Sequence, residues 1–205
     1  MDSRFFPGPA GRLDARLHGP EDGLPVLLCH PHPRFGGTMG SRLVYDLAVG
    51  LAAAGFRAVR FDYRGVGRSE GTYGRGDGET TDACAMFDAL VAETGKTPIV
   101  VGYSFGGGVA CRLATLRHPA RLIMVATPSP LTQSTLVPTA DAPTVRCPVA
   151  LVYGDRDELA PPEQARAVGA AFRPPVAPRF LPGAAHFLEP SHNPRVLAAV
   201  LEALA

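Results

Sequence analysis

Short apolar runs alternate with longer segments of helical period along this chain, and the alternation limits the folds that it can adopt. Runs such as VLLCH at residues 26–30 are nearly all apolar, which is typical of strands buried on both faces of a sheet. Segments with apolar residues at helical spacing lie between the runs, as they do where crossover helices join parallel strands. The sequence therefore predicts an α/β fold with a doubly wound, mainly parallel sheet and helices on both faces.

The expected elements follow in chain order. We predict strands at residues 26–30, 56–65, 98–103, 121–127, 148–154 and 178–183, and one or two edge strands around residues 12–19. We predict helices at residues 41–55, with Ser41 as the N-cap, and at 81–93, 105–117, 161–172 and 193–205. The Pro-, Ser- and Thr-rich segment 128–146 shows neither period, so we expect a loop that is too short for a separate lid.

Length, charge and hydropathy favour one soluble domain, residues 1–205. Apolar residues make up 46% and charged residues 19%, as in ordinary globular proteins. The 20 basic and 19 acidic side chains form no dense basic run, so we expect no nucleic-acid partner. The chain has no apolar leader and no stretch near the ~18 apolar residues of a membrane span, so we expect a cytoplasmic protein without a membrane partner.

The four cysteines are far apart and have apolar neighbours. They are Cys29, Cys84, Cys111 and Cys147, and none has the CxxC spacing of a metal site. We expect buried, reduced thiols.

The stretch GYSFGG, residues 102–107, lies between a predicted buried strand and a predicted helix. Gly102, Ser104 and Gly106 satisfy G-x-S-x-G, in which a sharp strand-to-helix turn exposes a nucleophilic serine. The N-H groups at the start of the helix would stabilise negative charge, and the Phe105 N-H is the first candidate oxyanion donor. We expect Gly107 and Gly108 to let the helix pack closely on neighbouring strands. The alternative is a glycine-rich turn that a serine caps.

A serine hydroxyl needs a base and an orienting acid to become a nucleophile at neutral pH. Asp155 and Asp157 follow the predicted strand 148–154, and His186 follows the last predicted strand. These positions lie at the edge where open α/β sheets build their sites, and the order Ser104, Asp157, His186 suits a triad. Two alternatives remain for the acid. Asp155 is the main competitor for this role, and Asp157 could instead be only a helix N-cap or a surface acid.

Five histidines remain. We expect His18, His118 and His192 to lie in surface turns, because each has Gly, Pro or Asn beside it. His30 and His32 lie in CHPHPRFGGTMGS, where the His32 N-H is the best second oxyanion donor because prolines have no N-H. The alternatives are structural histidines, or a metal site formed by Cys29, His30 and His32.

Five motifs together resemble those of the α/β-hydrolase superfamily. They are VLLCHPHP (26–33), FDYRGVGRSEG (61–71), VVGYSFGGG (100–108), GDRDELAP (154–161) and GAAHF (183–187). The chain is similar to small, lidless bacterial serine hydrolases whose oxyanion loop has the form HPHPxxGGTM, although the usual His-Gly pair of that loop is His30-Pro31 here. The resemblance implies an α/β-hydrolase fold without a cap domain, with Ser104 as the nucleophile, Asp157 as the acid and His186 as the general base.

The second motif, DYRGVGRSEG, is expected to be structural. By the same resemblance, its residues Asp62, Arg64, Gly65 and Gly67 shape the loop after a strand, and Ser69 is no nucleophile because no elbow precedes it.

The motifs point to an enzyme that cleaves a carboxylic ester or a related acyl bond of a small-molecule substrate through an acyl-enzyme. This chemistry requires no metal and no organic cofactor. Tyr103, Phe105 and Phe35 near the elbow indicate modest apolar acyl groups. The alternatives are a thioesterase or peptidase with the same triad, a metal-dependent hydrolase using His30 and His32, and a non-catalytic ligand-binding protein of the same fold.

Overall fold

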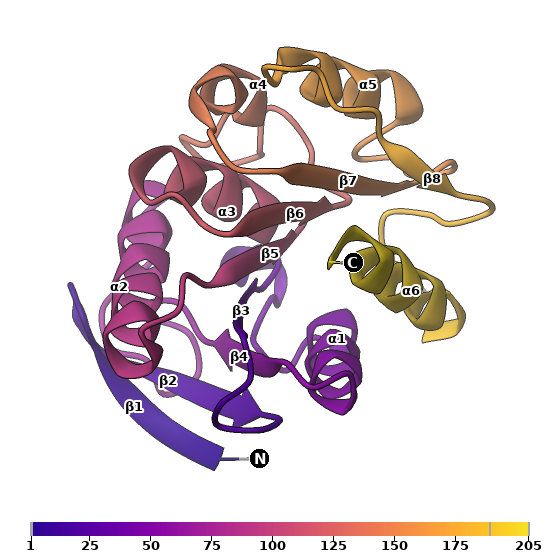
Figure 1. Cartoon of the computed structure of the whole chain (residues 1–205). Helices are drawn as coiled ribbons and strands as arrows, with labels where there is room; N and C mark the ends of the chain where they lie inside the picture. The colour runs from indigo at the N-terminus through magenta and orange to yellow at the C-terminus, as the bar shows by residue number, and fades with distance from the viewer. Residues whose placement is uncertain (1, 189, 205) are drawn as a thin grey trace.

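The computed structural model describes residues 2–188 and 190–204. In these residues eight strands form one sheet in the order β1-β2-β4-β3-β5-β6-β7-β8 (Figure 1). The strands are β1 (Asp2–Gly8), β2 (Gly11–His18), β3 (Pro25–Cys29), β4 (Arg57–Phe61), β5 (Ile99–Tyr103), β6 (Arg121–Val125), β7 (Val149–Gly154) and β8 (Arg179–Leu181). β1 and β2 are antiparallel at one edge, and every pair from β4 to β8 is parallel. The predicted mainly parallel sheet is confirmed.

Helices cover both faces of the sheet (Figure 1). They are α1 (Arg42–Ala53), α2 (Asp77–Thr94), α3 (Phe105–Leu116), α4 (Pro138–Asp141), α5 (Pro162–Ala171) and α6 (Asn193–Leu204), with short 3-10 turns at Pro33–Phe35, Ala142–Thr144 and Pro190–His192. α1 and α6 pack on one face, and α2, α3 and α5 pack on the other, which gives two hydrophobic cores.

The sequence explains why these layers form. Every residue of β3 and β5 is buried, as expected for central strands with a core on each face. In α1, Leu43, Leu47 and Leu51 recur at a spacing of four and are buried against the sheet. Because the central strands are parallel, their carboxyl ends lie at one edge of the sheet, where the loops that follow them meet.

Two predicted boundaries differ from the structure near the second motif. The strand expected at 56–65 ends at Phe61, because the chain turns at Gly65 and Gly67, whose φ values of 72° and 56° suit glycine. α2 begins at Asp77 rather than near residue 81, because the Glu79 carboxylate accepts hydrogen bonds from the N-H groups of Gly74 (2.8 Å) and Gly76 (2.7 Å). That carboxylate supplies the start of the helix.

Ser41 is the N-cap residue of α1, as predicted, but its hydroxyl does not cap the helix. Ser41 Oγ accepts a hydrogen bond from the Thr38 N-H at 3.1 Å and makes no side-chain cap bond to the helix. The hydroxyl instead closes the turn before α1.

The segment after β6, expected to be a loop throughout, contains one helical turn (α4) and a 3-10 turn at Ala142–Thr144. Leu131 and Leu136 are buried there, so the segment lies against the domain and forms no cap over the site. Proline at the first positions of each turn favours these short helices.

Two further expectations concern cysteines and membranes. Cys29, Cys84 and Cys111 are buried and Cys147 is half-buried, and all four are free thiols. Within the described ranges, no helix combines the length and the apolar character needed to span a membrane.

Candidate active site

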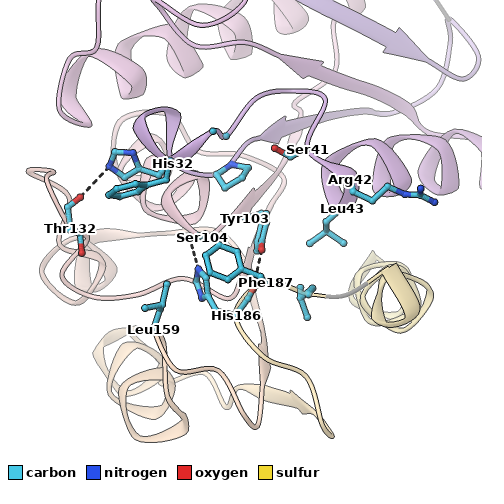
Figure 2. Close-up of a pocket in the computed structure, with 15 residues that line it drawn as sticks. His32, Ser41, Arg42, Leu43, Tyr103, Ser104, Thr132, Leu159, His186 and Phe187 are labelled. Carbon is cyan, nitrogen blue, oxygen red and sulfur yellow. Dashed lines mark hydrogen bonds between the residues drawn. The ribbon is translucent and has the colours of Figure 1, made fainter.

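Ser104 lies in the sharp turn between β5 and α3, at the edge of the sheet where the parallel strands end. Its backbone has a φ of 53° and a ψ of −118°. Only four non-glycine residues in the described part of the chain have a positive φ, and such a strained backbone persists only where the surroundings impose it. The turn leaves Ser104 half-buried at a pocket that it lines (Figure 2).

The glycines of GYSFGG permit close backbone approaches. A Cβ on Gly102 would lie 2.1 Å from the Gly106 carbonyl oxygen, and a Cβ on Gly106 would lie 2.1 Å from the Cys29 carbonyl oxygen. The elbow therefore requires glycine at both positions, as expected.

The next two glycines differ from the expectation. A Cβ on Gly107 would collide with Thr127, and one on Gly108 would meet Leu131, so both face the segment after β6 rather than neighbouring strands. Among these glycines, it is Gly106 that brings α3 against the end of β3.

His186 and Asp157 reach Ser104 from loops that follow β8 and β7. His186 Nε2 lies 2.9 Å from Ser104 Oγ, and His186 Nδ1 lies 3.0 Å from both carboxylate oxygens of Asp157. A carboxylate accepts and does not donate, so Nδ1 carries the ring hydrogen and Nε2 is free to accept from the Ser104 hydroxyl. The structure thus brings these three predicted site residues together.

The Asp157 carboxylate is held by its own loop. Its Oδ1 also accepts the N-H groups of Leu159 (2.9 Å) and Ala160 (2.7 Å). Asp157 and His186 are each 2% exposed, so solvent competes little with the bond between them.

Three side chains hold the backbone of the loop that carries His186. The Tyr103 hydroxyl donates to the His186 carbonyl (3.0 Å), the His186 N-H donates to Glu158 Oε2 (3.3 Å), and the Gly183 N-H donates to Asp155 Oδ1 (2.6 Å). Burial raises the pKa of Tyr103 to about 12, so its hydroxyl keeps the hydrogen that it donates. Asp155, the competing acid, therefore binds the loop backbone and not the imidazole.

Sequence reasoning missed the structural roles of Tyr103 and Glu158. Tyr103 lies inside the nucleophile motif and Glu158 directly follows Asp157, but their partners are far along the chain. Only the folded sheet edge brings each of them to the His186 loop, so no local pattern signals these contacts.

His32 lies in the loop after β3, beside the elbow. Its ring centroid is 4.6 Å from that of Phe105, its Nδ1 accepts the Arg34 N-H (3.2 Å), and its Nε2 lies 3.2 Å from the Thr132 carbonyl. Burial lowers the pKa of His32, so the ring is neutral and Nε2 donates to that carbonyl. Neither the His32 nor the Phe105 backbone N-H donates a hydrogen bond among the described residues.

His30 is fully buried below this loop. Its Nδ1 bonds to the Pro31 carbonyl (2.7 Å) and its Nε2 accepts the Tyr63 N-H (3.3 Å). Burial lowers the pKa of His30 to about 3, so the ring stays neutral and joins two loops. In the ranges that the structure describes, no three His, Cys, Asp or Glu side chains are placed to hold a metal ion, so nothing there favours the alternative with Cys29, His30 and His32.

The remaining histidines and Ser69 of the second motif do not line the pocket at Ser104. His18 is buried at the end of β2 and accepts from Arg60 Nε (3.0 Å), so its expected place in a surface turn is wrong. His118 is exposed and His192 is half-buried. Ser69 Oγ donates to the Asp62 carbonyl (2.7 Å) and is not at the site.

A pocket of about 600 Å³ opens in front of Ser104 and His186 (Figure 2). Its lining is mostly apolar and includes Phe35, Leu43, Tyr103, Leu159, Phe187 and Leu188. Phe105, which we expected near the substrate, is fully buried in the core and is not part of this lining.

Comparison with known proteins agrees with this fold. The family model described as the alpha/beta hydrolase fold matches residues 25–143. A solved structure of an alpha-beta serine hydrolase homologue from Coxiella burnetii has a TM-score of 0.89 at 30% identity, over 100% of this chain and 97% of that one. A serine hydrolase without a lid from Xanthomonas campestris has a TM-score of 0.85 at 26% identity, over 99% of this chain and 93% of that one.

Two curated relatives match over shorter stretches. An uncharacterized protein of Rickettsia prowazekii is 34% identical over 123 residues, which are 58% of this chain and 51% of that protein. A lysophosphatidylserine lipase of Macaca fascicularis is 41% identical over 78 residues, 38% of this chain and 19% of the lipase. The match therefore spans about half, or less, of these relatives. With more than half of its length matched by the family model, this chain belongs to the alpha/beta hydrolase family and has the fold of its lidless serine hydrolases.

Proposed function

We propose that this chain is a serine hydrolase that cleaves carboxylic esters or related acyl bonds through an acyl-enzyme intermediate. The observation that carries the proposal is the continuous hydrogen-bonded series from Ser104 Oγ through His186 to the Asp157 carboxylate, beside an open pocket. A binding protein of the same fold would have no use for a nucleophile, a base and an orienting acid within hydrogen-bond distance of one another.

The proposed reaction has two halves. His186 Nε2 takes the Ser104 proton as the hydroxyl oxygen attacks the acyl carbon, and Asp157 stabilises the imidazolium that forms. His186 then gives the proton to the leaving group as the acyl bond breaks. A water molecule, activated by the same imidazole, attacks the acyl-enzyme and releases the acid.

The oxyanion that forms during each attack needs hydrogen-bond donors. The Phe105 N-H, at the first position of α3, is one proposed donor, and the positive end of the helix dipole supports it. The His32 N-H is the proposed second donor, because Pro31 and Pro33 beside it have none and its ring packs on Phe105. Gly106 supports this pairing, since it lets the start of α3 approach the end of β3.

The relative that is named a lysophosphatidylserine lipase favours an ester as the substrate. The ester, thioester and amide of one acyl group, assayed side by side, decide which leaving group the site prefers.

Substitution of the nucleophile tests the proposal. Ser104→Ala should lower the turnover of p-nitrophenyl acetate and butyrate by at least roughly a thousandfold and abolish labelling by a fluorophosphonate probe. Ser41→Ala, which removes another hydroxyl of the same pocket, should keep the label. Turnover that survives Ser104→Ala would remove Ser104 from the mechanism.

A further inference from the structure

The two most exposed large apolar side chains of residues 2–188 and 190–204 lie at the mouth of the candidate active site. Phe187 is 70% exposed and Phe35 is 63% exposed, and both line the pocket in front of Ser104. Leu159, which is 49% exposed, lines it as well. Single exposed apolar residues are common on proteins, but a group at one pocket marks a surface that binds something apolar.

Phe35 and Phe187 come from opposite sides of the site. Phe35 ends the 3-10 turn after β3, and its ring lies 4.7 Å from that of His32, the proposed oxyanion side. Phe187 follows His186 and stands nearly perpendicular to its imidazole, with the ring centroids 5.3 Å apart (Figure 2). In an acyl-enzyme the carbonyl carbon is bonded to Ser104 Oγ. The rest of the acyl group then extends into the pocket that Ser104, Phe35 and Phe187 line together.

The charges of the lining favour an uncharged group in this space. None of the residues that line the pocket is Asp or Glu, and Arg42 is the lining residue with a permanent charge. The Arg42 Nε donates to both carboxylate oxygens of Asp46, at 3.0 Å and 2.8 Å, so that charge is already paired. The lining thus offers apolar contact rather than a counter-charge.

We propose that Phe35 and Phe187 bind the apolar acyl chain of the substrate between them, so that the preferred substrates are esters of unbranched aliphatic acids longer than acetate. This inference rests on the proposed function, because it takes Ser104 as the acyl carrier. The occupant of the exposed rim is the acyl chain of a single substrate molecule, because the rim is continuous with the pocket that contains the nucleophile.

A series of p-nitrophenyl esters from acetate through butyrate and hexanoate to octanoate, kept below their micellar concentrations, tests this. Each methylene fully removed from water contributes up to about fourfold in kcat/KM, so the open rim should give the unmodified protein a rise of roughly tenfold from acetate to hexanoate. Phe35→Ala and Phe187→Ala should each lower kcat/KM for hexanoate by about fivefold, mainly through KM, and change acetate by less than about twofold. Leu116→Ala, which truncates a 53% exposed side chain outside the pocket lining, is the matched control and should leave the profile unchanged.

Three results would overturn the inference. The first is an unchanged ratio of hexanoate to acetate in both phenylalanine variants. The second is an equal loss on every ester in Phe187→Ala, which would mean that this ring only supports His186. The third is an unchanged ratio together with lost binding to phosphatidylcholine vesicles or lost self-association in sedimentation, which would assign the rim to a membrane surface or to a second copy. Failure of the proposed function itself would look different, because the unmodified protein would then hydrolyse no ester at all.

Discussion

His186 and His30 are both almost completely buried at the same edge of the sheet, yet their surroundings are opposite. His186 has a carboxylate on Nδ1 and a hydroxyl on Nε2, and it lines an open pocket. His30 has a backbone carbonyl on Nδ1 and a backbone N-H on Nε2, and the carboxylate nearest to its Nε2, that of Asp62, is 4.0 Å away. Burial alone therefore does not make a base. The partner on Nδ1 and the access to Nε2 do.

The largest expected effect separates these two histidines. His186→Ala should lower kcat/KM for p-nitrophenyl butyrate by roughly ten-thousandfold, because no other group can take the Ser104 proton. His30→Asn, assayed at a temperature at which circular dichroism shows it folded, should stay within about tenfold of the unmodified protein, because His30 touches no reacting atom. Comparable losses in the two variants would break the comparison.

The second prediction separates the two aspartates of GDRDELAP in the same way. Asp157→Asn should lower kcat by roughly a hundredfold to ten-thousandfold, because an amide no longer stabilises the imidazolium or selects its tautomer. Asp155→Asn should stay within about threefold, because the amide oxygen still accepts the Gly183 N-H that Asp155 holds.

Steady-state kinetics on both aspartate variants decide between them. If Asp155→Asn proved the more damaging change, the acid would be assigned to the wrong residue of the pair.

The sequence was enough to predict the fold class and to nominate the residues that meet at the sheet edge. Apolar runs indicate the buried strands. The motifs with Ser104, Asp157 and His186 each directly follow a strand, so their residues lie at the same edge of the sheet. Asp155 and Asp157 were harder to separate, because both leave β7 within one turn and only the folded loop shows which carboxylate faces the imidazole.

The errors in the sequence reasoning have physical causes of the same kind. Gly19 beside His18 predicts a surface turn, but the pairing of β2 with β4 places His18 against Arg60. The position of Phe105 directly after Ser104 predicts a place near the substrate, but at the first position of α3 its side chain points into the core. Local spacing indicates which element holds a side chain, and tertiary packing decides which way it faces.

The smallest expected effect concerns stability rather than rate. Burial lowers the folded-state pKa of His30 to about 3, whereas the unfolded chain binds a proton with a pKa of about 6.5. The unfolded state therefore binds more protons between these values, and the free energy of unfolding falls as pH falls below about 6.5. Between pH 7 and pH 5 this one residue should account for a loss of about 2 kcal/mol.

Urea denaturation at pH 7, 6 and 5 measures this loss. His30→Asn should be less stable than the unmodified protein at pH 7, because it disturbs the bonds to Pro31 and Tyr63, but it should lose about 2 kcal/mol less on acidification. Burial also lowers the pKa of His18, to about 4, and the pKa of His32. Because these shifts have the same sign, both proteins should still lose some stability as the pH falls. His118→Asn, at an exposed position, controls for the removal of one imidazole. If His30→Asn and the unmodified protein lost the same free energy of unfolding between pH 7 and pH 5, His30 would take up a proton in the folded state. Its ring would then not be held neutral by burial, and this part of the comparison with His186 would fail.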